Sequence, residues 1–201
     1  MQEKLTRNEQ ILKYLVARCG KIAGRTRFLK FVYLADYYSH LFRGRPISSF
    51  RYIKWHHGPF DKSFYRVVKS LKTKGLITDE KLAWTKGELY RFLDTGGPVA
   101  FDLMPAELHV LSCVAELYQT AEIGELLDEI VYQTEPMKAV EGKPIGTRLD
   151  MQALNDRGRK QIGGLDIDTI LRSRQEIREG KYFGFDEFLA EMNVGLQAAN
   201  G

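Results

Sequence analysis

The 201-residue sequence contains only two cysteines, Cys19 and Cys113, and neither belongs to a Cys-x-x-Cys pair. A disulfide framework and a cysteine zinc site are therefore both excluded. The sequence also lacks a run of about 18–20 apolar residues, the length that a membrane-spanning helix needs. Its first residues, Met1–Thr6, are polar where a signal peptide would be apolar. We therefore expect a cytoplasmic protein that makes no contact with a membrane.

Signatures of catalysis are also missing. His56 and His57 are adjacent, so on a strand they would point to opposite faces, and no carboxylate or thiol stands at ligand spacing nearby. The paired glycines match neither a phosphate-binding loop nor a dinucleotide fingerprint. Cys19 stands near an expected helix end, where a free cysteine is typically a small buried hydrophobe. The sequence predicts no enzyme, no metal site and no cofactor.

Charge is distributed unevenly along the chain. Residues 1–91 contain 20 Lys or Arg and 7 Asp or Glu, a net charge of +13, whereas residues 92–201 contain 10 and 19, a net charge of −9; the whole chain carries +4. A basic half can attract phosphate groups, and an acidic half can cover a basic partner. The alternative is that the two halves attract each other within the molecule.

Apolar spacing predicts three helices in the first half, over residues 8–18, 26–42 and 61–74. The second is apolar almost all round, which is typical of a central buried helix. Asp61 is the expected N-cap of the third helix and Gly75 its terminator. Alternating apolar residues on either side of Lys86-Gly87 predict a β-hairpin. Three helices followed by a hairpin is the order of a winged helix-turn-helix.

The second half is expected to be helical. One helix begins at Met104-Pro105, another covers residues 123–131 and ends before Pro136, and two short ones lie in the tail. The fold class is therefore mainly α, within α+β, with a winged-helix-like first part packed on a helical second part. The expected organisation has three parts: 1–95, 99–155 and a C-terminal module, 165–201.

Two blocks of sequence resemble the Panacea domain of SocA-like antitoxins, a family also met among phage-associated proteins. The first block is a helix with a tyrosine-alanine stretch, a Gly-x-Pro loop, and an aromatic residue that two residues separate from a Gly-Pro pair. The second block, Glu129–Ala139, is a helix end before a proline turn, with Met137 where an aromatic residue is expected. The resemblance covers roughly residues 5–150. The residues that carry the first block are Tyr33, Ala35, Asp36, Gly44, Pro46, Trp55, Gly58 and Pro59.

We interpret these residues as scaffold. Gly58-Pro59 is expected to form an abrupt turn, because proline restricts the residue before it and glycine tolerates unusual dihedral angles. Trp55 is expected to pack beneath that turn together with Tyr33. The resemblance implies an antitoxin that neutralises a co-encoded toxin, by direct binding or by delivering the toxin to a protease. A homodimer remains open as a further assembly.

The tail is similar to the ends of small antitoxins, in which helices and a short strand wrap the toxin. Helix-in-groove binding and strand addition are the physical modes open to such a segment. The alternative is a helical hairpin that packs on its own domain. The residues expected to contact a toxin are Ile177, Tyr182, Phe183, Phe185, Phe188 and Leu189.

A second functional hypothesis is a winged-helix regulator that binds operator DNA and represses its own operon. The helix over 61–74 carries a basic stripe opposite its apolar one. A solvated basic face is the simpler interpretation, because basic residues are scattered over 1–91. The residues expected to contact nucleic acid are Lys62, Arg66, Lys69 and Lys72, supported by Arg25, Arg27 and Lys86.

Overall fold

The computed structural model describes residues 4–83 and 89–151. The mainly helical α+β class expected from the sequence is confirmed. In chain order the elements are α1 (Arg7–Cys19), β1 (Lys21–Ala23), α2 (Arg25–Arg43), β2 (Ile53–Trp55), β3 (Gly58–Phe60), α3 (Ser63–Thr73), β4 (Ile77–Leu82), β5 (Leu89–Asp94), α4 (Pro105–Tyr118), α5 (Ile123–Glu125), the π-helical η1 (Leu126–Val131) and α6 (Glu135–Lys138).

Helix α1 begins and ends where its local sequence specifies. The Thr6 side chain accepts a hydrogen bond from the Glu9 N–H, and the Glu9 carboxylate accepts one from the Thr6 N–H, which together form a capping box. Gly20 ends the helix with a φ of 69°, a conformation that favours glycine. The apolar stripe predicted for this helix is fully buried.

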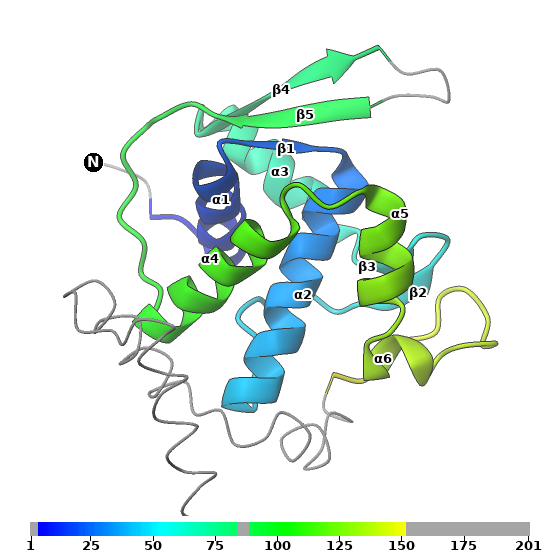
Figure 1. The fold of residues 1–201 in the computed structure, drawn as a ribbon. Coiled ribbons are helices and arrows are strands. Elements are labelled where there is room, and N and C mark those ends of the chain that lie inside the picture. Colours follow the sequence, from blue (N-terminus) through cyan, green and yellow to red (C-terminus); the bar gives the residue numbers. More distant parts are fainter. Residues whose placement is uncertain (1–3, 84–88, 152–201) are drawn as a thin grey trace, which may run out of the picture. The chain divides into compact units, whose positions relative to one another are not determined.

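Helix α2 is the central helix, as its all-round apolar sequence predicts. It runs through the middle of the molecule, with α1 and α4 beside it and the three-stranded sheet at one end (Figure 1). Its buried residues continue from Phe28 to Leu41 with the single gap of Tyr38. Gly44 ends it in the left-handed conformation and donates its N–H to the carbonyl oxygen of His40.

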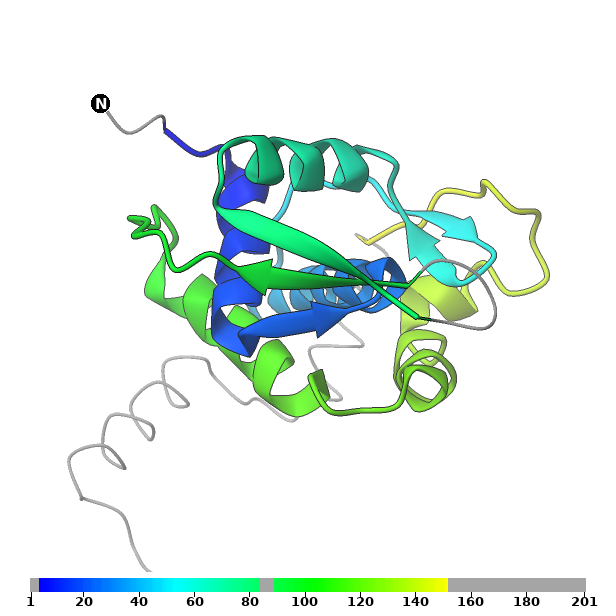
Figure 2. The same ribbon diagram turned by 90° about the horizontal axis from the view of Figure 1, so that it is seen from above.

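The predicted hairpin is β4–β5, and it gains a third strand from far upstream. The sheet order is β1-β5-β4, all antiparallel, with Ile22 opposite Phe92 and Asp79 opposite Phe92 on the other side. Seen from above, the sheet lies over the helices, with β4 on the side of α3 and β1 on the side of α4 (Figure 2). Strand β1 is absent from the sequence prediction, because three residues are too few to show a strand period.

The turn expected at Gly58-Pro59 lies two residues earlier, at His56-His57. His56 and His57 form the turn between β2 and β3, and Trp55 pairs with Gly58 across it. The histidines are thus in a turn and not on a strand. Gly58 has a φ of 84° directly after the turn, which explains why glycine is needed there. Pro59 can occupy a strand because this two-stranded ribbon leaves it at an edge.

The helices of the second part follow the predicted order with one irregularity. Pro105 occupies the first turn of α4, where its missing N–H is not needed. The single helix expected over 123–131 is instead a short α5 followed by η1, and Tyr132 donates its N–H to the Leu127 carbonyl oxygen. Pro136 belongs to the first turn of α6 and so begins a new helix.

One hydrophobic core joins the first part of the chain to the second. Buried residues from α1, α2 and α3 belong to the same cluster as residues from α4, η1 and α6. No helix in residues 4–83 or 89–151 is long and apolar enough to cross a membrane. The expected C-terminal module, 165–201, lies outside the described residues.

Candidate functional site

Asp36 organises the loop between α2 and β2. Its carboxylate is fully buried and accepts hydrogen bonds from the N–H groups of Ile47 (2.9 Å) and Ser48 (2.7 Å), from the Ser48 hydroxyl and from the Tyr52 hydroxyl (2.7 Å). Burial raises the pKa of Asp36 above its ordinary value, while these hydrogen bonds act to lower it. All the contacts of this carboxylate are internal, so Asp36 fixes the fold of the Gly-x-Pro loop.

The two sequence blocks meet at two tyrosines of α2. The hydroxyl of Tyr33, which is fully buried, lies 2.7 Å from the hydroxyl of Thr134, just before α6. One turn along α2, the Tyr37 hydroxyl donates to the Glu135 carboxylate. Burial raises the pKa of both tyrosines, so both stay protonated at neutral pH. The family-like residues of the first and second blocks therefore form one continuous interior.

The β2–β3 hairpin is held against α2 by a buried lysine. Lys30 is 2% exposed, and its ammonium donates a hydrogen bond of 2.6 Å to the carbonyl oxygen of Pro59. Burial lowers the pKa of Lys30 to about 7. Lys30 is absent from the site predicted from sequence, although a lysine inside a helix without a polar face is a signal of a buried charge.

Gly58 lies where a side chain would be crowded. A Cβ atom placed on it would lie 3.2 Å from Cε1 of Tyr132 and 3.4 Å from Cγ1 of Val131. The hairpin therefore contacts η1 directly through its backbone. Ala35 is also buried, and Gly44 ends α2, whereas Pro46 is exposed on the loop that follows.

The expected position of Trp55 is wrong. The side chain is 41% exposed and stacks on Phe60 of β3, with ring centroids 5.7 Å apart and planes 27° apart. Tyr33 packs instead edge-on against Tyr52, at 5.1 Å. The reason is that Trp55 is the last residue of β2 and lies directly before the exposed turn His56-His57.

Three of the four cations predicted on the third helix are available to a partner. Lys62, Arg66 and Lys69 are exposed on or just before α3, and within the described residues none of them forms an ion pair. Lys72 differs, because its ammonium lies 2.5 Å from the carboxylate of Asp79 on β4. The basic stripe is therefore shorter than the sequence predicts.

The supporting cations have mixed roles. Arg25 is exposed and stacks over the ring of Tyr90, with its guanidinium carbon 4.1 Å from the centroid. Arg27 donates to the carbonyl oxygens of Tyr118, the last residue of α4, and of Ala121, so it caps the C-terminal end of that helix. Lys86 lies outside the described residues.

Part of the opposite charge of the two halves is neutralised internally. Glu107 of α4, 3% exposed, pairs with both Arg7 and Arg43. Although burial acts to raise it, the pKa of Glu107 lies below its ordinary value, because the Met104 N–H and the two guanidinium groups bind the carboxylate. Arg18 pairs with Glu116 in the same way. The attraction between halves expected as one alternative is thus present, at specific pairs.

The described residues contain no cluster of three or more His, Cys, Asp or Glu side chains that could hold a metal ion. Burial raises the pKa of the Cys19 thiol to about 11, so it is protonated at neutral pH and a poor nucleophile.

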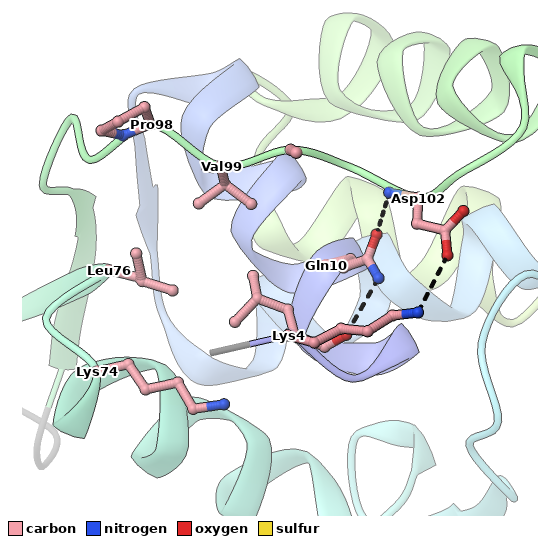
Figure 3. Close-up of a pocket in the computed structure, with 9 residues that line it drawn as sticks. Lys4, Gln10, Lys74, Leu76, Pro98, Val99 and Asp102 are labelled. Atoms are coloured by element: carbon pink, nitrogen blue, oxygen red, sulfur yellow. Dashed lines mark hydrogen bonds and ion pairs between the residues drawn. The ribbon is translucent and has the colours of Figure 1, made fainter. Parts of the chain in front are cut away.

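A hollow of about 540 Å³ lies between the start of α1, the end of α3 and the segment 98–102 (Figure 3). The Gln10 side chain spans it, accepting from the Asp102 N–H at 2.6 Å and donating to the Leu5 carbonyl oxygen. Lys4 points to the carboxylate of Asp102 at 3.9 Å. These polar groups bind one another, so the side chains along the hollow hold the 98–102 segment against α1.

The residues expected to contact a toxin, from Ile177 to Leu189, lie outside the described part of the chain. That hypothesis stays a prediction.

Comparison with known proteins identifies one matching family. No curated protein and no solved structure matches the chain. The family model for the antitoxin SocA-like Panacea domain matches residues 28–136, from the buried part of α2 to the first turn of α6. This range includes Tyr33, Asp36 and Gly58, and it ends within the second block that Tyr33 and Tyr37 contact. It covers more than half of the sequence, and the chain therefore belongs to the SocA-like antitoxin family with a Panacea domain.

Proposed function

We propose that this protein is the antitoxin of a toxin–antitoxin pair and that it neutralises a co-encoded protein toxin in the cytoplasm by direct binding. The observation that carries the proposal is the family match over residues 28–136. The contacts of the motif support a scaffold role for its buried polar residues, because Tyr33, Asp36 and Lys30 direct their polar atoms to internal partners.

The test is co-expression with the product of the adjacent gene. The neighbour alone should stop growth, and the present chain should restore growth and co-purify with the neighbour as a stable complex. A neighbour that is harmless, or one that never co-purifies, would contradict direct neutralisation. Rescue that requires an active cellular protease would assign the alternative mechanism, delivery of the toxin for degradation.

The contribution of the tail is tested in the same assay by deleting residues 165–201. Because the buried residues from Ile11 to Leu149 form a continuous hydrophobic core, we expect the shortened chain to fold. If the tail contacts the toxin, rescue weakens while the melting temperature of the remaining domain is kept. Full rescue by the shortened chain would assign binding to the Panacea domain alone.

A second candidate function, autoregulatory DNA binding, is favoured by one specific observation. The order is α1-β1-α2-β2-β3-α3-β4-β5, with β5 between β1 and β4. Apart from the β2–β3 hairpin this order is similar to that of a winged helix, which supports the proposal that α3 acts as a recognition helix. Lys62, Arg66 and Lys69 lie exposed there. The two functions are compatible, because an antitoxin can also repress its own operon.

A further inference from the structure

Two exposed aromatic side chains stand close together on the hairpin and on α3. Of the large apolar side chains that lie exposed in the described residues, Trp55 (41%) and Tyr65 (47%) are the aromatic ones. Phe60 lies between them, 5.7 Å from the Trp55 ring and 5.9 Å from the Tyr65 ring, measured between centroids. We call these three residues, Trp55, Phe60 and Tyr65, the aromatic ladder.

An arginine extends the ladder toward the sheet. The guanidinium carbon of Arg25 lies 6.0 Å from the Tyr65 centroid and 4.1 Å from the Tyr90 centroid. Trp, Tyr and Arg are the residue types that most often dominate the binding energy of protein interfaces. Trp55, Tyr65 and Arg25 are exposed at one place, while Phe60 and Tyr90 pack against the core. The concentration of these exposed residue types points to a binding role.

Hydrogen bonds to other segments fix the hairpin that carries Trp55 and Phe60. The Lys54 backbone exchanges hydrogen bonds with the segment 146–147, through its N–H to the Thr147 carbonyl oxygen (2.7 Å) and its carbonyl oxygen from the Gly146 N–H (2.8 Å). The Lys54 ammonium donates to the carbonyl oxygens of Val140 and Lys143. On β3, the Pro59 carbonyl oxygen accepts a hydrogen bond from the buried Lys30 ammonium. Fixing anchors before binding reduces the entropy lost in a complex.

The charge around the ladder is positive. Arg66 and Lys69 are exposed on the same helix as Tyr65, and Lys62 is exposed directly before it; none of the three forms an ion pair within the described residues. The acidic residue nearest in sequence, Asp61, is already engaged, since its two carboxylate oxygens accept from Ser63 and from the Arg51 N–H. A partner that fits this surface carries acidic side chains around an apolar patch.

We propose that the aromatic ladder and the cations beside it are the docking surface for the toxin, which meets them with an apolar patch rimmed by acidic residues. This inference rests on the proposed antitoxin function and adds the surface and the partner's chemistry. It also gives the family motif a role beyond scaffold, because the buried part of the motif holds Trp55 in an exposed position.

Ring geometry favours a protein over single-stranded nucleic acid as the partner. Bases bind by stacking on open aromatic faces. Here Phe60 stacks on Trp55, and the Arg25 guanidinium stands over the rings of Tyr65 and Tyr90. Because these neighbours cover one face of each ring, less face area remains for bases to stack on, whereas the ring edges and the apolar surface suit the side chains of a protein.

The test measures the affinity of the full chain for the purified product of the adjacent gene, together with growth rescue. The double variant W55A/Y65A should raise Kd about thirtyfold or more and abolish rescue. The matched control is M104A/L117A. Met104 lies just before α4 and is 41% exposed, and Leu117 lies on α4 and is 66% exposed. This control should change Kd less than threefold. Melting curves of all variants establish that each is folded.

A charge variant tests the surface without touching the rings. R66E/K69E alters only exposed side chains, and it should slow association about tenfold at low salt and flatten the salt dependence of the rate. If W55A/Y65A is less stable than the wild type, R66E/K69E provides the decisive test of the docking surface.

The outcomes separate the two proposals. If the wild-type chain neither binds nor rescues, the antitoxin function fails and the docking surface falls with it. If the wild-type chain binds and both W55A/Y65A and R66E/K69E bind equally well, the antitoxin function stands and the docking surface is overturned. If W55A/Y65A loses binding to a labelled 20-nucleotide single strand while its affinity for the toxin is unchanged, the ladder is a nucleic-acid site and the inference is likewise overturned.

Discussion

The hydroxyl groups of Tyr33 and Thr134 lie 2.7 Å apart across 101 residues of sequence, and Thr134 passes the hydrogen bond on to the Val131 carbonyl oxygen. This contact links the two blocks on which the family assignment depends.

We expect Tyr33→Phe and Thr134→Val each to destabilise the protein by about 1–2 kcal/mol and to show a coupling free energy of about 1 kcal/mol. The measurement is a double-mutant cycle in urea. Tyr33→Phe combined with Thr95→Val, whose hydroxyl bonds elsewhere to Gly75, should be additive; additivity in the Tyr33–Thr134 cycle too would contradict the link.

Gly58→Ala should be strongly destabilising, by about 2–4 kcal/mol, because a Cβ there meets Tyr132 and Val131 and because the φ of 84° disfavours alanine. Two matched glycine-to-alanine variants separate the causes. Gly20 has a φ of 69° but open space around it, and Gly124 has open space and lies in α5. Urea unfolding should rank the losses Gly58 above Gly20 above Gly124, with Gly124→Ala neutral or stabilising. Equal losses at Gly58 and Gly20 would show that close approach to η1 has no effect.

Asp36 should respond differently to two substitutions. Asp36→Ala leaves two buried N–H groups and two hydroxyls without their acceptor and should cost about 3–5 kcal/mol. Asp36→Asn keeps one oxygen for the N–H groups, and the hydroxyls of Ser48 and Tyr52 can rotate to accept from the amide, so the loss should be about 1–2 kcal/mol. Chemical denaturation of both variants provides the comparison. A loss for Asn as large as for Ala would mean that the negative charge itself is required.

Lys30 predicts a dependence of stability on pH. Its pKa is lowered from 10.5 to about 7 in the folded protein, so between these pH values the unfolded state binds more protons and stability rises with pH. Below about pH 7 both states are protonated and the cost of the buried charge is fully present. Relative to Lys30→Met, the wild-type free energy of unfolding should therefore increase between pH 6.5 and 9.5, on the order of 3 kcal/mol.

Urea unfolding of both proteins at several pH values measures this difference. Taking the difference cancels the tyrosines, whose raised pKa values act at higher pH in both proteins. A constant difference across the range would show that Lys30 keeps an ordinary pKa.

The DNA-binding candidate predicts a specific salt dependence. If Arg66 and Lys69 contact phosphates of the operator, the double variant R66Q/K69Q should reduce the slope of log K against log salt by about 1.8, since each contact contributes about 0.9. Lys72→Gln should change it less, because Lys72 pairs with Asp79. Fluorescence anisotropy with a duplex from upstream of the gene measures the slope. An unchanged slope for R66Q/K69Q would remove α3 from any DNA complex.

The sequence by itself determined the order of helices and hairpin in the described part of the chain. Caps such as Thr6 with Glu9, terminators such as Gly20 and the apolar period of α1 act within a few residues, so they are readable without the fold. The family blocks are readable for the same reason, because each is a contiguous stretch. The central position of α2 also followed from the sequence, since a helix that is apolar all round has to be covered on every side.

Only the tertiary structure decided which residues became partners. Strand β1 exists because β5, some 70 residues later, offers it an edge, and the hydrogen bonds of Asp36 and Tyr33 depend on where the 44–52 loop and α6 dock. Trp55 is exposed because it ends β2 beside the exposed turn His56-His57, and Lys72 forms an ion pair because β4 brings Asp79 beside it. These outcomes depend on contacts between distant segments, which local periodicity and capping do not encode.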